Sequence, residues 1–409
     1  MRVNVRSRAI ALLLLVTFAS TAIFSQQRRA SSIRASSINE TTLKAHIKFL
    51  SDDLLEGRGT GARGGELAAK YIASQLEEFG LTGAGVNGSF FQPVSLVGVK
   101  ADPSTRLIIS NRKDTGIFTF ADDFVAFTGA QTEQVDVDTD LVFVGYGINA
   151  PEQHWNDYKG EEADYRGKIL VMLVNDPPAT TEEPNLFSAK ALTYYGRWTY
   201  KYEEAARRGA AGAILLHTDQ SAGYPWGVVR TSNGSWRFDI ARTPDDSTPF
   251  LKFRSWMTDE AAHRMMKLAD QDLDALRTQA ASRDFQPVKL GVKAKLYLKS
   301  EVKRVAAPNV VGALQGSDPK LRSEYVVYSA HWDHLGVGAP NKDGDTIYNG
   351  ALDNASGVAC VLAIAETLAK MPAALRPRRS SLFLFPTAEE QGLLGAEWYS
   401  KHSVVPLVN

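Results

Sequence analysis

The sequence predicts an α/β protein, with a mostly parallel central sheet flanked by helices and a β-rich domain inserted into it. After residue 291, continuous apolar runs typical of buried strands alternate with helical patterns, which favours a parallel sheet covered on both faces. Helical patterns also occur near the start of residues 38–116, up to Gly80, whereas residues 117–290 carry short apolar runs separated by loops. A chain of 409 residues exceeds the size at which one hydrophobic core usually divides, so more than one domain is expected.

The flanking parts, residues 38–116 and 291–409, supply the elements of the central sheet. One helix begins near Asn39, and a second follows the glycine-rich segment Glu56–Gly61 and stops at Gly80. The elements expected after residue 291 are the strands Tyr325–Ala330 and Ser381–Phe385 and the helices Ser356–Ala369 and Gly392–His402. The first of these strands has the pattern of a buried strand.

The insert, residues 117–290, is expected to form a separate small domain. Its clearest strands are Leu141–Gly147 and Lys168–Val174, and a helix near Tyr202–Arg208 leads into another apolar run. A long loop, Ser221–Pro249, follows and is rich in Trp, Gly and Pro. Such a loop could overhang a neighbouring surface.

The first 25 residues resemble a secretory signal peptide. Arg2, Arg6 and Arg8 precede an apolar run from Ala9 to Val16, which is too short to span a bilayer as a membrane anchor. We expect cleavage between residues 19 and 25, followed by a linker over residues 26–37. The sequence therefore predicts a secreted or periplasmic protein with no stable membrane anchor after cleavage.

Composition excludes several partners. The chain is 44% apolar and 22% charged, as is usual for a soluble globular protein. Basic and acidic residues balance at 46 each, so the positive field typical of nucleic-acid binders is missing and no nucleic-acid partner is expected. The single cysteine, Cys360, excludes an internal disulfide.

Polar residues gather at three predicted strand ends or helix starts, in the segments His331–His334, Gly350–Gly357 and Thr387–Glu390. The carboxyl ends of strands are where open α/β sheets bind ligands. Imidazole and carboxylate groups together suit zinc, and a catalytic zinc keeps one position open for water. Neighbouring side chains of an extended segment point in opposite directions. Glu389 and Glu390 could therefore have different roles, one binding metal and the other accepting a proton.

Each cluster alone has a plainer interpretation. A lone histidine at a strand end is usually only hydrogen-bonded, Asp353 before a helix would be an N-cap, and two glutamates would form a solvated turn. The occurrence of all three clusters in order favours a site. His334 is interpreted as a structural or cleft-lining residue.

These segments resemble metallopeptidase family M28, the dizinc aminopeptidases. The matching motifs are Ala330–Asp333, Gly350–Gly357 and Ala388–Gly395. The insert is similar to the protease-associated domain found in many of these enzymes, on the segments Gly145–Gly147, Trp155–Gly160 and Gly167–Val171. The resemblance implies a zinc-exopeptidase fold.

The resemblance also implies roles for single residues. His331 would bind one zinc ion, Asp353 would bridge two, and Glu390 would bind the other. Glu389 would be the general base, and Asp333 would be the carboxylate that orients the zinc-bound histidine. The implied cofactor is Zn²⁺, two ions in the complete site. The implied substrates are peptide or protein N-termini, from which one residue at a time is removed by a water that the two zinc ions activate.

The family's site needs two more ligands, an aspartate on the strand after Glu389–Glu390 and a later histidine, and neither has a counterpart before Asn409. We therefore expect an incomplete fold and a fragment or truncated product, whose own activity must be judged apart from the family's. Alternatives are carboxypeptidase or glutaminyl-cyclase activity on the same fold. A further alternative is a non-catalytic peptide-binding fragment built on the insert, motivated by Tyr224, Trp226 and Trp236 in its aromatic loop.

Overall fold

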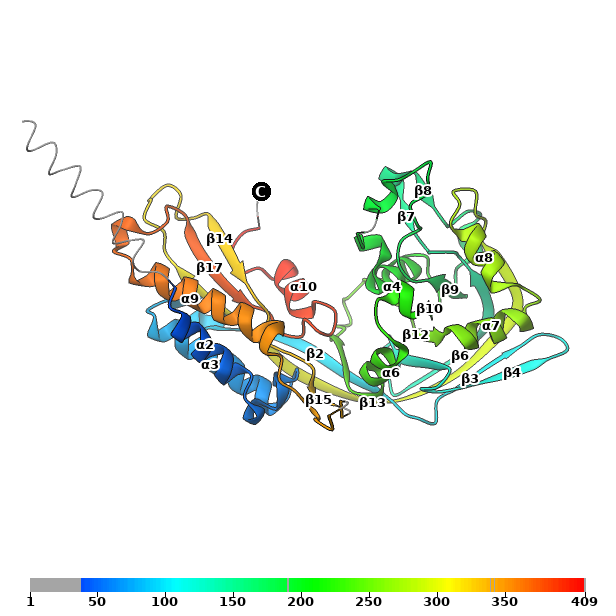
Figure 1. Ribbon diagram of the computed structural model, residues 1–409, viewed down its shortest axis with the longest axis horizontal. Coiled ribbons are helices and arrows are strands. Elements are labelled where there is room, and N and C mark those ends of the chain that lie inside the picture. The colour runs from blue at the N-terminus through cyan, green and yellow to red at the C-terminus, as the bar shows by residue number, and fades with distance from the viewer. Residues whose placement is uncertain (1–37, 190, 339, 342, 408–409) are drawn as a thin grey trace, which may run out of the picture. The chain divides into compact units, whose positions relative to one another are not determined.

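The computed structural model describes residues 38–407 except 190, 339 and 342 (Figure 1). The predicted signal peptide, residues 1–25, and the linker, residues 26–37, lie outside the described residues. The mixture of sheet strands and covering helices confirms the α/β class.

The chain divides into two compact units. The first contains the described residues up to Val94 together with Ala307–Val337 and the chain from Ile347 onward, and the second contains Ser95–Ala306 and Gly338–Thr346. The second unit is wider than the predicted insert, residues 117–290. Its resemblance to a protease-associated domain stays a prediction.

The first unit contains a mixed sheet. Strand β14 (Tyr325–Ser329) runs parallel to β17 (Ser380–Phe385), and β17 runs antiparallel to the end of β13 (Val288–Leu314). Strand β1 (Thr82–Gly83) also pairs antiparallel with β13. The mostly parallel arrangement predicted for this sheet is therefore limited to the β14–β17 pair, because β13 enters as one long antiparallel strand rather than after a crossover helix.

Helices cover this sheet as the periodicity predicts. Helix α2 (Glu40–Leu50) begins at Asn39, whose side chain accepts a hydrogen bond from the Thr41 amide at 2.8 Å. Helix α3 (Arg63–Glu78) buries the apolar face that contains Ala68, Ile72 and Leu76. The remaining helices and short strands of this unit are α9 (Ser356–Lys370), α10 (Leu394–Lys401), β15 (Gly336–Val337) and β16 (Ile347–Tyr348). Figure 1 shows α2, α3 and α9 packed together.

Within the described residues, the segment Ala351–Lys370 is long and apolar enough to cross a membrane by length and composition alone. It contains α9, which packs on α2, α3 and the strands β14 and β17. The core helix of a soluble protein meets the same criterion, so this segment carries no membrane assignment.

Strand β14 is more exposed than its apolar sequence predicts. Val326 and Val327 are 43% and 45% exposed, whereas all of β17 is buried. Among the described strands β14 pairs only with β17, so one of its edges has no neighbouring strand. The prediction of a buried strand was wrong because periodicity alone does not reveal how many neighbours a strand has.

The second unit is built around a parallel core, in which β6, β9, β10 and β12 are neighbours in that order. Strand β5 adds antiparallel to β12, and both β3 and β6 pair antiparallel with β13. The strands of this unit are β2 (Phe91–Ala101), β3 (Arg106–Ser110), β4 (Thr115–Thr119), β5 (Phe124–Thr128), β6 (Gln134–Phe143), β7 (Asn149–Ala150), β8 (Trp155–Asn156), β9 (Ile169–Leu173), β10 (Gly212–His217), β11 (Arg237–Ile240) and β12 (Phe253–Thr258). Its helices are α4 (Trp198–Arg207), α5 (Asp219–Ala222), α6 (Trp226–Gly234), α7 (Asp259–Leu268) and α8 (Leu273–Ala280). The predicted strands near 141–147 and 168–174 and the helix near 202–208 correspond to β6, β9 and α4.

The aromatic segment Ser221–Pro249 is not a plain loop, because it contains α6 and β11. The Trp226 indole donates a hydrogen bond to the Ala121 carbonyl at 3.0 Å. Tyr224 and Trp226 both pack against the core of the second unit. These two rings therefore stabilise the unit that contains them.

The exposure of β14 can be tested on a matched pair, because Val327 faces the fully buried Leu382 across the β14–β17 ladder. Leu382→Ala should lower the free energy of unfolding by about 2–5 kcal/mol, since it opens a cavity. Val327→Ala should cost less than about 1 kcal/mol. Denaturant unfolding of both variants measures the difference, and equal losses would mean that β14 belongs to the core.

Candidate metal-binding site

The three polar clusters converge in the first unit. His331 follows β14, Asp353 lies in the turn before α9, and Glu389 and Glu390 follow β17. The His331 Nε2 atom lies 3.0 Å from Asp353 Oδ1 and 3.8 Å from Glu389 Oε2. His331 and Glu389 lie close together because β14 and β17 are parallel and end at the same edge of the sheet.

The ring of His331 has a defined orientation. Its Nδ1 atom lies 3.1 Å from the Asp333 main-chain carbonyl oxygen, which can only accept a hydrogen bond. Donation from Nδ1 leaves Nε2 as an acceptor that faces the Asp353 carboxylate at 3.0 Å. Two acceptors at that distance need a proton or a cation between them, so this contact fits a cation site.

His334 belongs to the same cluster, although its sequence context suggested only a structural or cleft-lining role. Its Nδ1 atom lies 2.6 Å from Glu390 Oε1, and its main-chain amide donates to the Arg58 carbonyl at 3.2 Å. Both side chains are mostly buried, with 13% of His334 and 17% of Glu390 exposed. The signal that could have identified His334 is its place three residues after His331 in the same loop.

Two overlapping donor groups result. His331, Glu389 and Glu390 offer ligand atoms within 4.8 Å of one another, and so do His334, Asp353 and Glu390. Ligand atoms around one tetrahedral zinc lie about 3.3 Å apart, given bonds of about 2.0–2.1 Å. The 3.0 and 3.8 Å contacts of His331 bracket that spacing, whereas the 2.6 Å contact of His334 is a direct hydrogen bond. The donor set therefore fits zinc, with the closest match around His331.

Asp333 holds neighbouring residues of the site in place. Its side chain is fully buried, and burial raises the pKa of its carboxyl to about 6. Its Oδ1 atom accepts the main-chain amide of Glu389 at 3.1 Å, and its Oδ2 atom accepts the Thr60 hydroxyl at 3.3 Å. The same Oδ1 lies 3.8 Å from His331 Nδ1, beyond hydrogen-bond distance. In this structure the carboxylate of Asp333 fixes the backbone of Glu389, and its main-chain carbonyl orients His331.

Arg58 ties the site's loops together. The guanidinium donates to the Trp332 carbonyl at 2.9 Å, to the Asn349 carbonyl at 2.7 Å and to the Gly350 carbonyl at 2.9 Å, and it also contacts the carbonyl of Leu50. Arg58 is 1% exposed. Burial lowers the pKa of its guanidinium to about 10, and neighbouring carboxylates oppose that change.

Glycine is required where the loops meet. Gly350 has a φ of +60°, and a Cβ atom there would lie 2.4 Å from the Asp353 carbonyl oxygen and 2.6 Å from the His334 ring. Gly57 has a φ of +64°, and a Cβ atom would lie 2.5 Å from the Tyr348 carbonyl oxygen. The glycines of these motifs therefore permit close approach of the backbone to the metal-ligand candidates.

The loop that contains Glu389 and Glu390 is held by Asn309, which is fully buried. Its Oδ1 atom accepts the Thr387 amide at 3.0 Å, and its Nδ2 atom donates to the Gly395 carbonyl at 2.9 Å. The loop is a turn rather than an extended segment, with Ala388 at a φ of +51°. The two glutamates reach different histidines because of this turn, and not because of the strand alternation that the sequence suggested.

Comparisons with known proteins agree with the motifs. Residues 309–408 match the family model of peptidase family M28. No curated protein matched the chain.

Solved structures to which the chain is similar include an aminopeptidase from Aneurinibacillus sp. strain AM-1, at 20% identity and a TM-score of 0.46, with 89% of this chain and 66% of that chain covered. A peptidase M28 precursor from Shewanella amazonensis SB2B has 17% identity and a TM-score of 0.45, with 92% and 70% covered. A zinc aminopeptidase from Bacillus subtilis has 20% identity and a TM-score of 0.40, with 90% and 66% covered. This chain thus spans about 66% of the length of the first and third of these proteins.

Because Arg58 holds several loops of the site together, we expect its replacement to cause a large loss of stability. Arg58→Met should lower the free energy of unfolding by about 3 kcal/mol or more, because several buried carbonyls lose their donor. Arg379→Met is the matched control. It removes an arginine whose ion pair with Glu324 is half-exposed, and should cost less than about 1 kcal/mol. Chemical denaturation compares the two, and similar small losses would show that Arg58 does not hold the loops.

Proposed function

We propose that this chain, whose residues 309–408 match the family model of peptidase family M28, is a zinc-dependent peptidase of aminopeptidase type. The observation that carries the proposal is the convergence of His331, Asp353 and the Glu389–Glu390 pair at one edge of the sheet. A structural zinc site usually has closed tetrahedral ligation, often by thiolates. Imidazole and carboxylate donors that are partly open to solvent are instead typical of a catalytic zinc.

In this proposal His331, Asp353 and Glu390 hold the metal, and His334 stands beside Glu390 as a further donor. Bound zinc would supply Lewis acidity, which lowers the pKa of a water molecule and polarises the substrate carbonyl. Asp353 has the most exposed carboxylate of the group, with 63% of its side chain exposed, so it faces the side from which a substrate arrives.

Glu389 is the proposed general base. Its carboxylate lies 3.8 Å from the proposed ligand His331, and a third of its side chain is exposed, so it can reach a solvent molecule at the site. The hydrogen bond from its amide to the buried Asp333 fixes its backbone. Glu389 would accept the proton of the attacking water and then deliver it to the amine that leaves.

The excess of carboxylates at the site supports the proposal of aminopeptidase action. A free α-amino group is positively charged, and Asp353 and Glu389 offer negative charge next to the reacting position. A substrate without that amino group would lose the interaction. We further propose that the protein is exported, on the basis of the basic and apolar pattern of residues 1–25.

Substitution of the two glutamates separates their roles. In the full-length protein, Glu389→Gln should keep zinc content near wild type and lower the turnover number by about 10²–10⁴, because only the proton acceptor is lost. Glu390→Gln should lower zinc occupancy first, because it removes a ligand. Metal analysis and steady-state kinetics on an aminoacyl anilide measure both effects. Retained turnover in Glu389→Gln, or zinc loss equal to that of Glu390→Gln, would reverse the assignment.

Substrate blocking tests the exopeptidase proposal. Hydrolysis of a short peptide should need a free N-terminus, and N-acetylation should lower kcat/KM by at least about tenfold, the effect of losing one charged hydrogen bond. Removal of zinc with a chelator should abolish hydrolysis of the free and of the acetylated peptide, and added zinc should restore it. Equal cleavage of the acetylated peptide would favour another peptidase activity, and release of C-terminal residues would favour carboxypeptidase action.

A further inference from the structure

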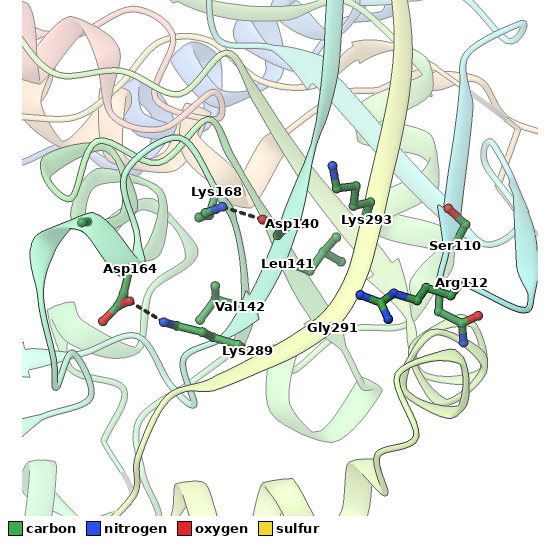
Figure 2. Close-up of a pocket in the computed structure, with 12 residues that line it drawn as sticks. Ser110, Arg112, Asp140, Leu141, Val142, Asp164, Lys168, Lys289, Gly291 and Lys293 are labelled. Carbon is green, nitrogen blue, oxygen red and sulfur yellow. Dashed lines mark hydrogen bonds and ion pairs between the residues drawn. The ribbon is translucent and has the colours of Figure 1, made fainter.

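The second unit contains a pocket that has no part in the proposed reaction. Its volume is about 620 Å³, which lies within the usual range for small-ligand sites. Figure 2 shows it around strand β13, with walls from β6, from the end of β3 and from the turn before β9. The charged residues that line it are Arg112, Asp140, Asp164, Lys168, Lys289 and Lys293. Four cations and two carboxylates give the lining a net charge of +2.

Two of these cations are neutralised within the pocket. Lys168 pairs with Asp140 at 2.5 Å, and Lys289 pairs with Asp164 at 2.6 Å. The lysine hydrogen bonds lower the pKa of both carboxyls, so the two acids stay ionised at neutral pH. These pairs hold Lys168 and Lys289 at the wall of the pocket. The net positive charge is therefore carried by Arg112 and Lys293.

Arg112 and Lys293 carry that excess. Among the described residues, Arg112 forms no ion pair with a carboxylate of the pocket. Lys293 lies across the ladder from Asp140 and helps to lower the pKa of that carboxyl, but the Asp140 carboxylate is hydrogen-bonded to Lys168. Lys293 lies on β13 between Ser110 of β3 and Asp140 of β6, so its backbone is paired on both sides. Figure 2 shows the Arg112 guanidinium turned toward β13 near Gly291.

The turn that presents Arg112 is held rigidly. The Asn111 side-chain oxygen accepts the amides of Lys113 and Asp114 at 2.7 and 2.6 Å, and its side-chain nitrogen donates to the Leu268 carbonyl at 2.7 Å. The Asn111 amide also donates to the Asp114 carbonyl at 3.0 Å. A cation on a fixed turn loses less entropy on binding an anion than one on a mobile loop.

The strand opposite Arg112 leaves room for a ligand. The ladder between β13 and β6 shifts register between Lys289 and Lys293, which marks a bulge. Gly291 lies in this bulge with a φ of +68°, and nothing lies within 4 Å of the position that a Cβ atom would take. The bulge therefore forms an open part of the pocket between the paired and the excess cations.

We propose that this pocket binds a short acidic peptide through its carboxylate groups, with Arg112 and Lys293 as the principal contacts. Arginine and lysine pair with carboxylates through charge-assisted hydrogen bonds, and arginine does so with two parallel bonds. The pocket is much larger than one phosphate ion. Its volume of about 620 Å³ leaves room for the main chain of a short peptide as well as for its charges.

Calorimetric titration of the full chain with acetyl-Glu-Glu-Glu tests the proposal without a catalytic readout. The acetyl group keeps the probe from acting as an aminopeptidase substrate. Arg112→Gln and Lys293→Gln should each weaken binding about three- to tenfold, because both side chains are partly solvated. The matched control is Lys295→Gln, two residues along the same face of β13 and outside the pocket lining. It should change the affinity less than about twofold. Thermal unfolding of each variant verifies that it folds.

The outcomes are distinct from those of the peptidase test, because the pocket lies in the second unit of the chain and the candidate metal site lies in the first. Loss in the two pocket variants but not in Lys295→Gln supports the site. Equal loss in all three would mean that only the general positive charge of the strand attracts the probe. No binding at millimolar acetyl-Glu-Glu-Glu overturns the proposal, as does equal binding of acetyl-Gln-Gln-Gln. Binding of inorganic phosphate in place of the peptide overturns it too.

Discussion

The buried guanidinium of Arg58 is the interaction on which the candidate metal site depends. It donates to main-chain carbonyls from three separate segments: Leu50 at the end of helix α2, Trp332 beside the proposed ligand His331, and Asn349 and Gly350 before Asp353. Arginine suits this task because its planar fork can donate in several directions and stays charged when buried. The loops that carry the ligand candidates are therefore fixed by main-chain contacts and do not rely on the metal alone.

Five of the nine described α-helices, and several of the buried strands, could be predicted from periodicity. Helix α3 buries the face marked by Ala68, Ile72 and Leu76, and α9 covers the whole predicted span of 356–369. What periodicity could not supply was the number of neighbours of each strand. The apolar strand β14 is exposed because only one described strand pairs with it, and the long β13 makes the sheet mixed. Pairing is set by contacts between residues that are distant in sequence, which no local pattern encodes.

The sequence located the candidate metal ligands better than the residues that position them. His331, Asp353, Glu389 and Glu390 come together as the motifs predict. Arg58 was missed because an arginine in a glycine-rich segment usually lies on the surface. Three of the four carbonyls that it contacts lie far along the chain. His334 was interpreted as a structural or cleft-lining residue, because its place near His331 in the sequence does not indicate its contact with Glu390.

The charge balance of the site explains why a divalent cation suits it. Asp333, Asp353, Glu389 and Glu390 bring four carboxylates into a small region, and burial of Asp333 already raises its pKa to about 6. Arg58 can offset only one of these charges, and its own pKa is lowered to about 10 by burial. The structure holds the carboxylates together by backbone anchors, such as the bond from the Glu389 amide to Asp333. A cation between them would relieve their mutual repulsion, so metal binding and stability of this unit are linked.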